Sequence, residues 1–137
     1  MQLDHLVIWV EDPARSVAFF VEVVGLTAVR LDDWRAGAAP YPSVRISDTT
    51  IMDVIPLASA ADVNKLPGAA GTAGNKTNHI CLAMSRSEFD ALRARLEAAG
   101  TRPGHFTTDA FGARGTAPRA FYFRDPDGNI FEARHYD

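Results

Sequence analysis

The chain has 137 residues, of which 47% are hydrophobic and 23% charged, a composition typical of one globular domain or of two small fused modules. A formal net charge of −3 and the lack of a lysine and arginine cluster argue against nucleic-acid binding. The chain has no apolar run of membrane-spanning length, no leading basic segment, and only one cysteine, Cys81. We therefore expect a cytoplasmic protein with no membrane partner and no internal disulfide.

The first half of the chain is predicted to form a strand, a helix and three further strands. Alternating residues rich in β-branched types indicate a strand at 3–10. Asp12 followed by Pro13 is typical of a helix start, and Gly25 is placed to end that helix. Short runs with strand composition complete this half, and they lie at 26–31, 43–46 and 50–55.

After residue 57 the composition changes to Ala, Gly, Asn and Pro, so 58–76 is expected to be a linker. The first pattern then begins again with an alternating strand at 77–84. Ser85 and Glu88 make the signature of a capping box at the start of a second helix, and Gly100 is placed to end it. The remaining elements are expected to be a weak strand at 102–107, a glycine-containing loop at 111–115 and a closing β-hairpin at 121–132.

The two halves match each other as copies of one supersecondary unit. The strand around His5 aligns with the strand around His79 at an offset of 74 residues (79 − 5). Asp53 and Glu132 each place a carboxylate among apolar residues in the last strand of their copy. We therefore predict an α+β fold of two tandem βαβββ modules in one domain, with module 1 at 1–57, the linker at 58–76 and module 2 at 77–137.

Two histidines and a carboxylate from different strands make a set of N, N and O ligands that suits a catalytic divalent metal such as Zn, Ni, Mn or Fe. His5, His79 and Glu132 are the candidates. A simpler interpretation stays open, in which the histidines are structural and an arginine neutralises Glu132. The arginines that could do so are Arg45, Arg114 and Arg134. Under the metal interpretation, Glu132→Gln weakens metal binding more than it destabilises the fold.

Three stretches of the chain resemble the vicinal oxygen chelate superfamily, which includes glyoxalase I, type I extradiol dioxygenases, and the fosfomycin and bleomycin resistance proteins. They are Asp-His-Leu-Val-Ile-Trp-Val-Glu-Asp at 4–12, Asn-His-Ile at 78–80, and Tyr-Phe-Arg-Asp-Pro-Asp-Gly at 122–128, which leads to Glu132. The resemblance implies paired βαβββ modules whose strands curl into a cleft around one divalent metal ion, often completed in a homodimer. It also implies that His5, His79 and Glu132 are the metal ligands.

Differences from the family's patterns narrow the expected function. Glyoxalase I has a glutamate at the position of Asp53, where it is both ligand and proton-transfer base, so the shorter Asp53 is expected to bind through water or to act as a base. Extradiol dioxygenases have a catalytic histidine in the region 111–116, which holds none here, although Tyr122 matches. Bleomycin resistance proteins lack the metal ligands that this chain keeps. The resemblance therefore favours a metal-dependent lyase or isomerase of the glyoxalase type, with Asp53 or Glu132 carrying the proton.

The substrate is expected to be a small molecule that chelates the metal through two adjacent oxygens. The residues expected to contact it are Trp9, Cys81, Arg114 and Tyr122. His105 and His135 have no counterpart in the repeat and are expected on the surface or behind the site. The alternative function is a resistance protein that either binds a drug unchanged or, as in fosfomycin resistance, joins a thiol to a phosphonate.

Overall fold

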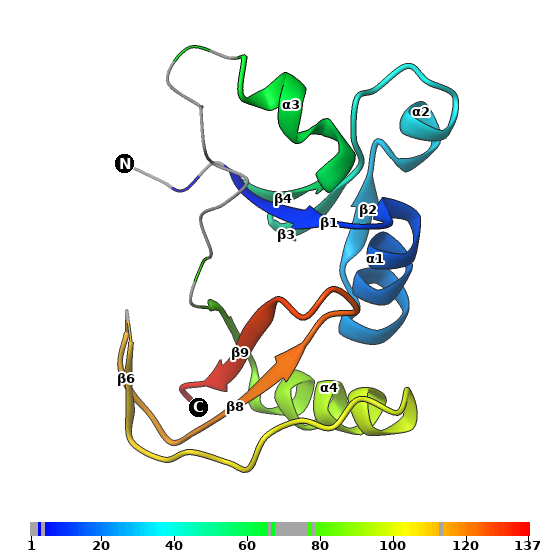
Figure 1. The fold of residues 1–137 in the computed structure, drawn as a ribbon. Coiled ribbons are helices and arrows are strands. Elements are labelled where there is room, and N and C mark those ends of the chain that lie inside the picture. Colours follow the sequence, from blue (N-terminus) through cyan, green and yellow to red (C-terminus); the bar gives the residue numbers. More distant parts are fainter. Residues whose placement is uncertain (1–2, 4, 66, 68–76, 78, 113) are drawn as a thin grey trace. The chain divides into compact units, whose positions relative to one another are not determined.

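The computed structural model describes residues 3, 5–65, 67, 77, 79–112 and 114–137 (Figure 1). The chain divides into two compact units, Met1–Lys76 and Thr77–Asp137. The first unit combines several helical segments with an open sheet, and the described part of the second combines one helix with an open sheet, which confirms the predicted α+β class. None of the described helices has the length and apolarity needed to span a membrane.

The first unit follows the predicted order of strand, helix and three strands. Its sheet has the order β1-β4-β3-β2, with β1 parallel to β4 and the other pairs antiparallel. The strands are β1 (His5–Val10), β2 (Thr27–Val29), β3 (Ser43–Ser47) and β4 (Thr50–Pro56). The helical segments are α1 (Pro13–Phe19), the π-helical turn η1 (Phe20–Val24), α2 (Leu31–Arg35), the 3-10 turn η2 (Leu57–Ser59) and α3 (Ala60–Val63).

The first helix forms where the capping signals predict it. The Asp12 side chain accepts hydrogen bonds from the backbone N–H groups of Ala14 and Arg15, at 2.9 and 3.2 Å. Gly25 takes the left-handed conformation, with φ 91°, that ends the helical segment. The helix packs on β4, and the core of this unit includes Val17, Phe20, Val44, Met52 and Val54, all fully buried.

Two short helical segments of the first unit were not predicted from the sequence. Helix α2 begins at Leu31, the last residue of the strand predicted at 26–31, and ends at Arg35. Residues 57–63 form η2 and α3 at the start of the expected linker. Most of that linker, 66 and 68–76, lies outside the described residues. Short helices of four or five residues bury no continuous apolar stripe, so hydrophobic periodicity gives little signal for them.

The second unit has a sheet of the order β5-β9-β8 and a separate two-stranded hairpin. Strand β5 is parallel to β9, and β8 is antiparallel to β9. The elements are β5 (Ile80–Met84), α4 (Arg86–Ala98), β6 (Ala110–Gly112), β7 (Gly115–Ala117), β8 (Arg119–Arg124) and β9 (Ile130–His135).

Helix α4 begins at the predicted capping box. The Ser85 hydroxyl accepts from the Glu88 N–H, while the Glu88 carboxylate accepts from the Ser85 N–H at 3.1 Å. Its apolar stripe is buried, and the Phe89 ring lies 4.8 Å from the Phe121 ring on β8. At the far end of the sheet, Asp125 accepts from the backbone N–H groups of residues 127 and 129 and so closes the β8–β9 turn.

The segment predicted as a weak strand at 102–107 forms only an isolated bridge, between Thr107 and Ala120. Pro103 has no N–H and cannot contribute a donor to strand pairing. The next residue, Gly104, donates to the Tyr122 carbonyl at 2.8 Å. The loop expected at 111–115 is instead the centre of the β6–β7 hairpin, in which Gly115 has φ 95°.

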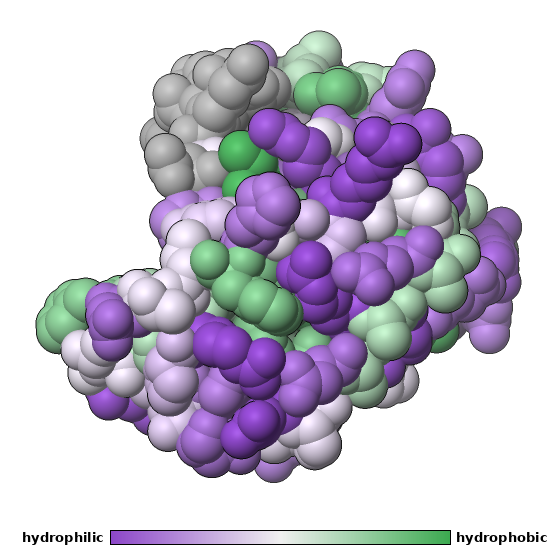
Figure 2. Space-filling view, turned by 90° about the horizontal axis from the view of Figure 1, so that it is seen from below, coloured by the Kyte–Doolittle hydropathy of each residue, from purple (hydrophilic) through white to green (hydrophobic). Residues whose placement is uncertain are grey.

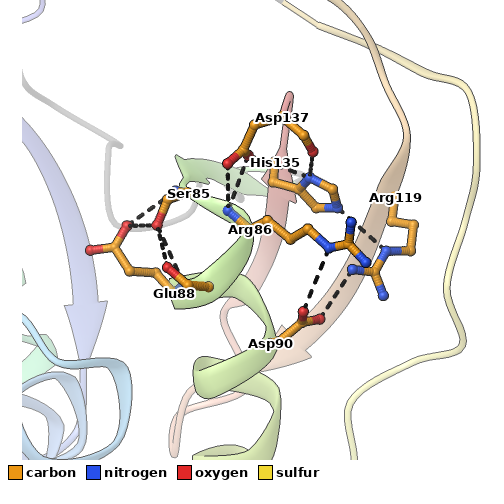
Figure 3. Close-up of polar contacts among 8 residues, drawn as sticks. Ser85, Arg86, Glu88, Asp90, Arg119, His135 and Asp137 are labelled. Carbon is orange, nitrogen blue, oxygen red and sulfur yellow. Dashed lines mark hydrogen bonds and ion pairs between the residues drawn. The ribbon is translucent and has the colours of Figure 1, made fainter.

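His135 is buried, so of the two places expected for it, on the surface or behind the site, the surface is excluded. Figure 3 shows its ring between the chain end and β8, with Nδ1 2.6 Å from the Asp137 carbonyl oxygen. Its Nε2 accepts from Arg119 Nε at 3.3 Å, so the ring carries its proton on Nδ1. Arg119 also pairs with Asp90 on α4 at 3.1 Å. His105 is exposed, as expected.

The face drawn in Figure 2 is largely hydrophilic, with separate hydrophobic areas between the polar ones. Large apolar side chains are exposed in both units, and they include Leu3, Val7, Leu57, Phe106 and Phe111. Scattered apolar residues of this kind are normal on a protein surface and need no partner to explain them.

Candidate functional site

The centre of the second unit's sheet brings several predicted site residues together. Glu132 on β9 lies opposite Cys81 on β5 and opposite Tyr122 on β8. Directly paired residues share a face of a sheet, so these three side chains stand on one face. His79, which precedes β5, joins them through its contact with the glutamate.

Glu132 is almost fully buried, with 1% of the residue exposed, and both of its oxygens have partners. Oε1 accepts from Arg134 Nε at 3.1 Å and from Nη2 at 2.5 Å. Oε2 lies 3.2 Å from His79 Nε2. A buried carboxylate needs such compensation, because moving an unpaired charge out of water costs several kcal/mol. The ion pair therefore has the form that the simpler interpretation expected, with Arg134 as the arginine.

The histidine side of this contact faces partly towards solvent. The His79 side chain is 32% exposed, and its ring meets the Tyr122 ring edge to face at a centroid distance of 5.4 Å. The aromatic contact fixes the plane of the imidazole so that Nε2 points at Glu132. A fixed imidazole that points at a carboxylate oxygen can either hydrogen-bond to that oxygen or share a cation with it.

The contact between His79 and Glu132 fits two positions of a metal site. Two atoms that bind one ion at about 2.1 Å stand roughly 3.0–3.4 Å apart in octahedral or tetrahedral geometry, and the observed Nε2–Oε2 distance is 3.2 Å. No three His, Cys, Asp or Glu side chains of the described residues gather as a metal-binding group. His79 and Glu132 thus supply an N and an O donor, while the third predicted ligand, His5, belongs to the other unit.

Two acidic groups beside Glu132 are held in their protonated forms. Burial raises the pKa of the Cys81 thiol, and the negative charge of Glu132 raises it further. The pKa of the Tyr122 hydroxyl is raised for the same reasons in the same order. At neutral pH both groups are therefore hydrogen donors next to the carboxylate rather than anions.

In the first unit, Asp53 on β4 lies opposite Val7 on β1 and is 5% exposed. Its Oδ1 accepts a 2.6 Å hydrogen bond from the Ser43 hydroxyl. Arg30 Nη2 stands 3.7 Å from the same oxygen and donates to the Ser43 hydroxyl at 3.1 Å. A serine and an arginine thus hold this carboxylate, and neither was predicted from the sequence.

His5 and Trp9 share the sheet face of Asp53. Both lie on β1 two positions from Val7, the residue paired with Asp53, and side chains two positions apart in a strand point to the same side. The two units correspond closely in this respect, because Asp53 lies opposite the residue two positions after His5. In the same way, Glu132 lies opposite Cys81, two positions after His79.

Arg134 connects the glutamate to the β6–β7 hairpin and to the chain end. Its Nη1 donates to the Ala110 carbonyl and to the Tyr136 hydroxyl, each at 3.4 Å. Arg114, predicted to contact substrate, stacks on the Tyr136 ring at 4.4 Å. Glu132, Arg134 and Tyr136 form a row of every second residue, along β9 and just past its end. The sequence alone could have revealed this β9 row, because its members alternate with Phe131, Ala133 and His135.

The chain is similar to known proteins over nearly its whole length. A model of the Glyoxalase/Bleomycin resistance protein/Dioxygenase superfamily matches residues 2–133. Virulence protein STM3117 of Salmonella typhimurium is 29% identical over 136 residues, which cover 98% of this chain and 84% of that protein.

Solved structures have the same fold. An integron cassette protein from the mobile metagenome of V. cholerae is 26% identical, covers 100% of this chain and 96% of its own, and has a TM-score of 0.77. A lactoylglutathione lyase from Agrobacterium tumefaciens is 19% identical, with coverage of 98% and 92% and a TM-score of 0.70.

Proposed function

Because the chain belongs to the Glyoxalase/Bleomycin resistance protein/Dioxygenase superfamily, we propose that it is a divalent-metal-dependent enzyme of the glyoxalase type. Its substrate would be a small molecule with two adjacent oxygens and a proton next to a carbonyl group. The observation that carries the proposal is the 3.2 Å contact between His79 Nε2 and Glu132 Oε2 on one sheet face. A divalent ion held by these atoms would stabilise negative charge that develops on a substrate oxygen.

The chain's own residues have distinct parts in this proposal. His79 and Glu132 would donate to the ion, and the family resemblance implies His5 as the third ligand. Arg134 occupies Oε1 of Glu132, which leaves Oε2 as the oxygen for the ion. In this proposal Arg134 engages one oxygen of Glu132 and the ion would engage the other, so Glu132 acts as a ligand. We therefore assign the proton transfer to Asp53.

The test is a titration of chelator-treated protein with Zn, Ni, Mn and Fe ions, one at a time. We expect one ion to bind per chain and His79→Ala to weaken binding at least about tenfold. His105→Ala is the matched control, because His105 is an exposed histidine of the same unit. Equal effects of the two substitutions would contradict the metal assignment.

The reaction class has a separate test that does not require the natural substrate. In deuterated water, the protein should exchange the protons next to the carbonyl of hydroxyacetone, and proton NMR follows their loss. We expect exchange only with metal present and less of it in Asp53→Asn. Metal binding without any exchange of these protons would keep the site and exclude this chemistry for the probe.

A second candidate is a protein that binds a small molecule without metal and leaves it unchanged. The observation that favours it is the Arg134 guanidinium, which compensates the charge of Glu132 with no metal needed. The absence of any stoichiometric ion in the metal titration would select this function.

The proposal also includes a homodimer, which the family resemblance implies. The mass of the protein in solution, measured by light scattering at several concentrations, tests it directly.

A further inference from the structure

A cavity of about 500 Å³ lies in the second unit at the end of β5, beside the hairpin loop and the end of the chain. Its walls are Ala83, Met84, Ser85, Arg114, Tyr136 and Asp137. The volume falls within the range of about 300–1,000 Å³ that small-molecule sites commonly have. The cavity is open to solvent, and its lining is about as polar as it is apolar.

Most polar groups of this lining are already engaged. The Ser85 hydroxyl belongs to the capping box of α4, and it bonds to the Glu88 carboxylate at 2.7 Å (Figure 3). The Asp137 carboxylate accepts from the Arg86 N–H with both oxygens, at 3.0 and 3.2 Å. The Tyr136 hydroxyl accepts from Arg134. Of these three groups, only Tyr136 keeps a donor, a single neutral O–H with no acceptor among the described residues, while the Ser85 hydroxyl already donates to Glu88 and a carboxylate has nothing to donate.

Arg114 is the exception. Its guanidinium makes no hydrogen bond or ion pair with another described residue, and it only stacks on the Tyr136 ring at 4.4 Å. A guanidinium has five N–H donors in a planar fork that matches the two oxygens of a carboxylate. Stacking holds the plane of that fork while its edge stays open. The cavity therefore contains one preoriented cationic fork with unused donors.

We propose that this cavity binds the carboxylate group of an organic acid through Arg114, with the acid's apolar part against Ala83 and Met84. The assignment of this acid as the far end of the substrate rests on the proposed function, but binding itself requires no metal. Arg134 and Tyr136 connect this cavity with Glu132, because Arg134 bonds both the Glu132 carboxylate and the Tyr136 hydroxyl. A carboxylate bound by Arg114 would thus lie further along the β9 row that contains Glu132.

The test uses a matched pair of probes, 3-phenylpropanoate and its amide, 3-phenylpropanamide. Each is titrated into 15N-labelled protein, as purified and again after chelation, and backbone amide shifts give the location and the affinity. We expect the acid to shift the amides of residues 84, 85 and 136 and to bind about tenfold or more tightly than the amide. Arg114→Gln should remove that preference, and Arg114→Lys should keep part of it.

Arg102→Gln is the control, since it removes the same charge from an exposed arginine of the same unit. It should leave the preference for the acid unchanged. Equal affinities for acid and amide, shifts away from the cavity, or an equal effect of the control would overturn the proposal. A protein that binds no metal but still prefers the acid would refute the proposed function alone.

Discussion

The buried pair of Glu132 and Arg134 makes a prediction that separates stability from metal binding. The two side chains are 2% and 7% exposed, and two hydrogen bonds join them. Glu132→Gln removes the negative charge and leaves the guanidinium buried without a counter-charge. Breaking a buried pair in this way costs about 3–5 kcal/mol. The glutamine oxygen can still accept one hydrogen bond, so we expect about 3 kcal/mol.

The stability lost by Glu132→Gln is compared with that of Arg134→Met and of the double variant that carries both substitutions. Arg134→Met alone should cost a similar amount, because it leaves the glutamate charge buried. Removal of both charges avoids either penalty, so Glu132→Gln with Arg134→Met should be more stable than each single variant. For a urea dependence of about 2 kcal/mol per M, the single variants should unfold about 1.5 M earlier than the original protein.

The assay is urea unfolding followed by circular dichroism, together with tryptophan fluorescence. Both tryptophans, Trp9 and Trp34, lie in the first unit, so fluorescence reports that unit and the dichroism reports both. Metal affinity is measured on the same four proteins. We expect the double variant to recover stability but not metal binding, because a neutral amide is a poor metal ligand. Additive losses in the double variant would refute the ion pair.

Two further predictions concern single contacts. Ser85→Ala should destabilise the protein by about 1 kcal/mol at neutral pH, since it removes the cap of α4. Hydrogen bonds from the Ser85 hydroxyl and N–H hold the pKa of Glu88 below its ordinary value. The stability that these bonds give is therefore fully present above pH 4.5, the ordinary pKa of Glu88, and is lost as the pH falls through the lower pKa of Glu88 in the folded protein. The difference in stability between Ser85→Ala and the original protein should therefore shrink in urea titrations at acidic pH. In the first unit, Ser43→Ala should cost about 1–3 kcal/mol, because buried Asp53 loses its shortest hydrogen bond. Arg30→Gln should cost less than about 1 kcal/mol, because the Arg30 side chain is 37% exposed, and urea midpoints of the two variants compare them directly.

The sequence predicts those elements of the fold whose signals are local and strong. The Asp12 and Ser85 caps, the helix-ending Gly25 and the Asp125 turn each act within a few residues, and all of them form as expected. The repeat also holds at the level of strand register, because each unit places its carboxylate opposite the residue two positions after its histidine.

The features that the sequence did not predict either have a weak local signal or depend on contacts between distant residues. The β6–β7 hairpin has only three residues in each strand, and a loop with glycine and alanine gives no alternation to detect. The choice of Arg134 over Arg45 or Arg114 as the partner of Glu132 required the sheet geometry. The Ser43 contact of Asp53 arises from strand pairing between residues 10 positions apart (53 − 43). Arg30, just beyond β2, is 23 positions from Asp53 in the chain (53 − 30).

The arginine two residues beyond Glu132 has a consequence for the order of events during biosynthesis. Zinc fingers are unfolded without their metal ion, and they fold when the ion binds. Here the buried glutamate has its counter-charge on its own strand, so a newly made chain can complete this sheet without any ion. In the proposed metal enzyme, metal supply would then govern how many folded molecules carry the ion, and not how many of them fold.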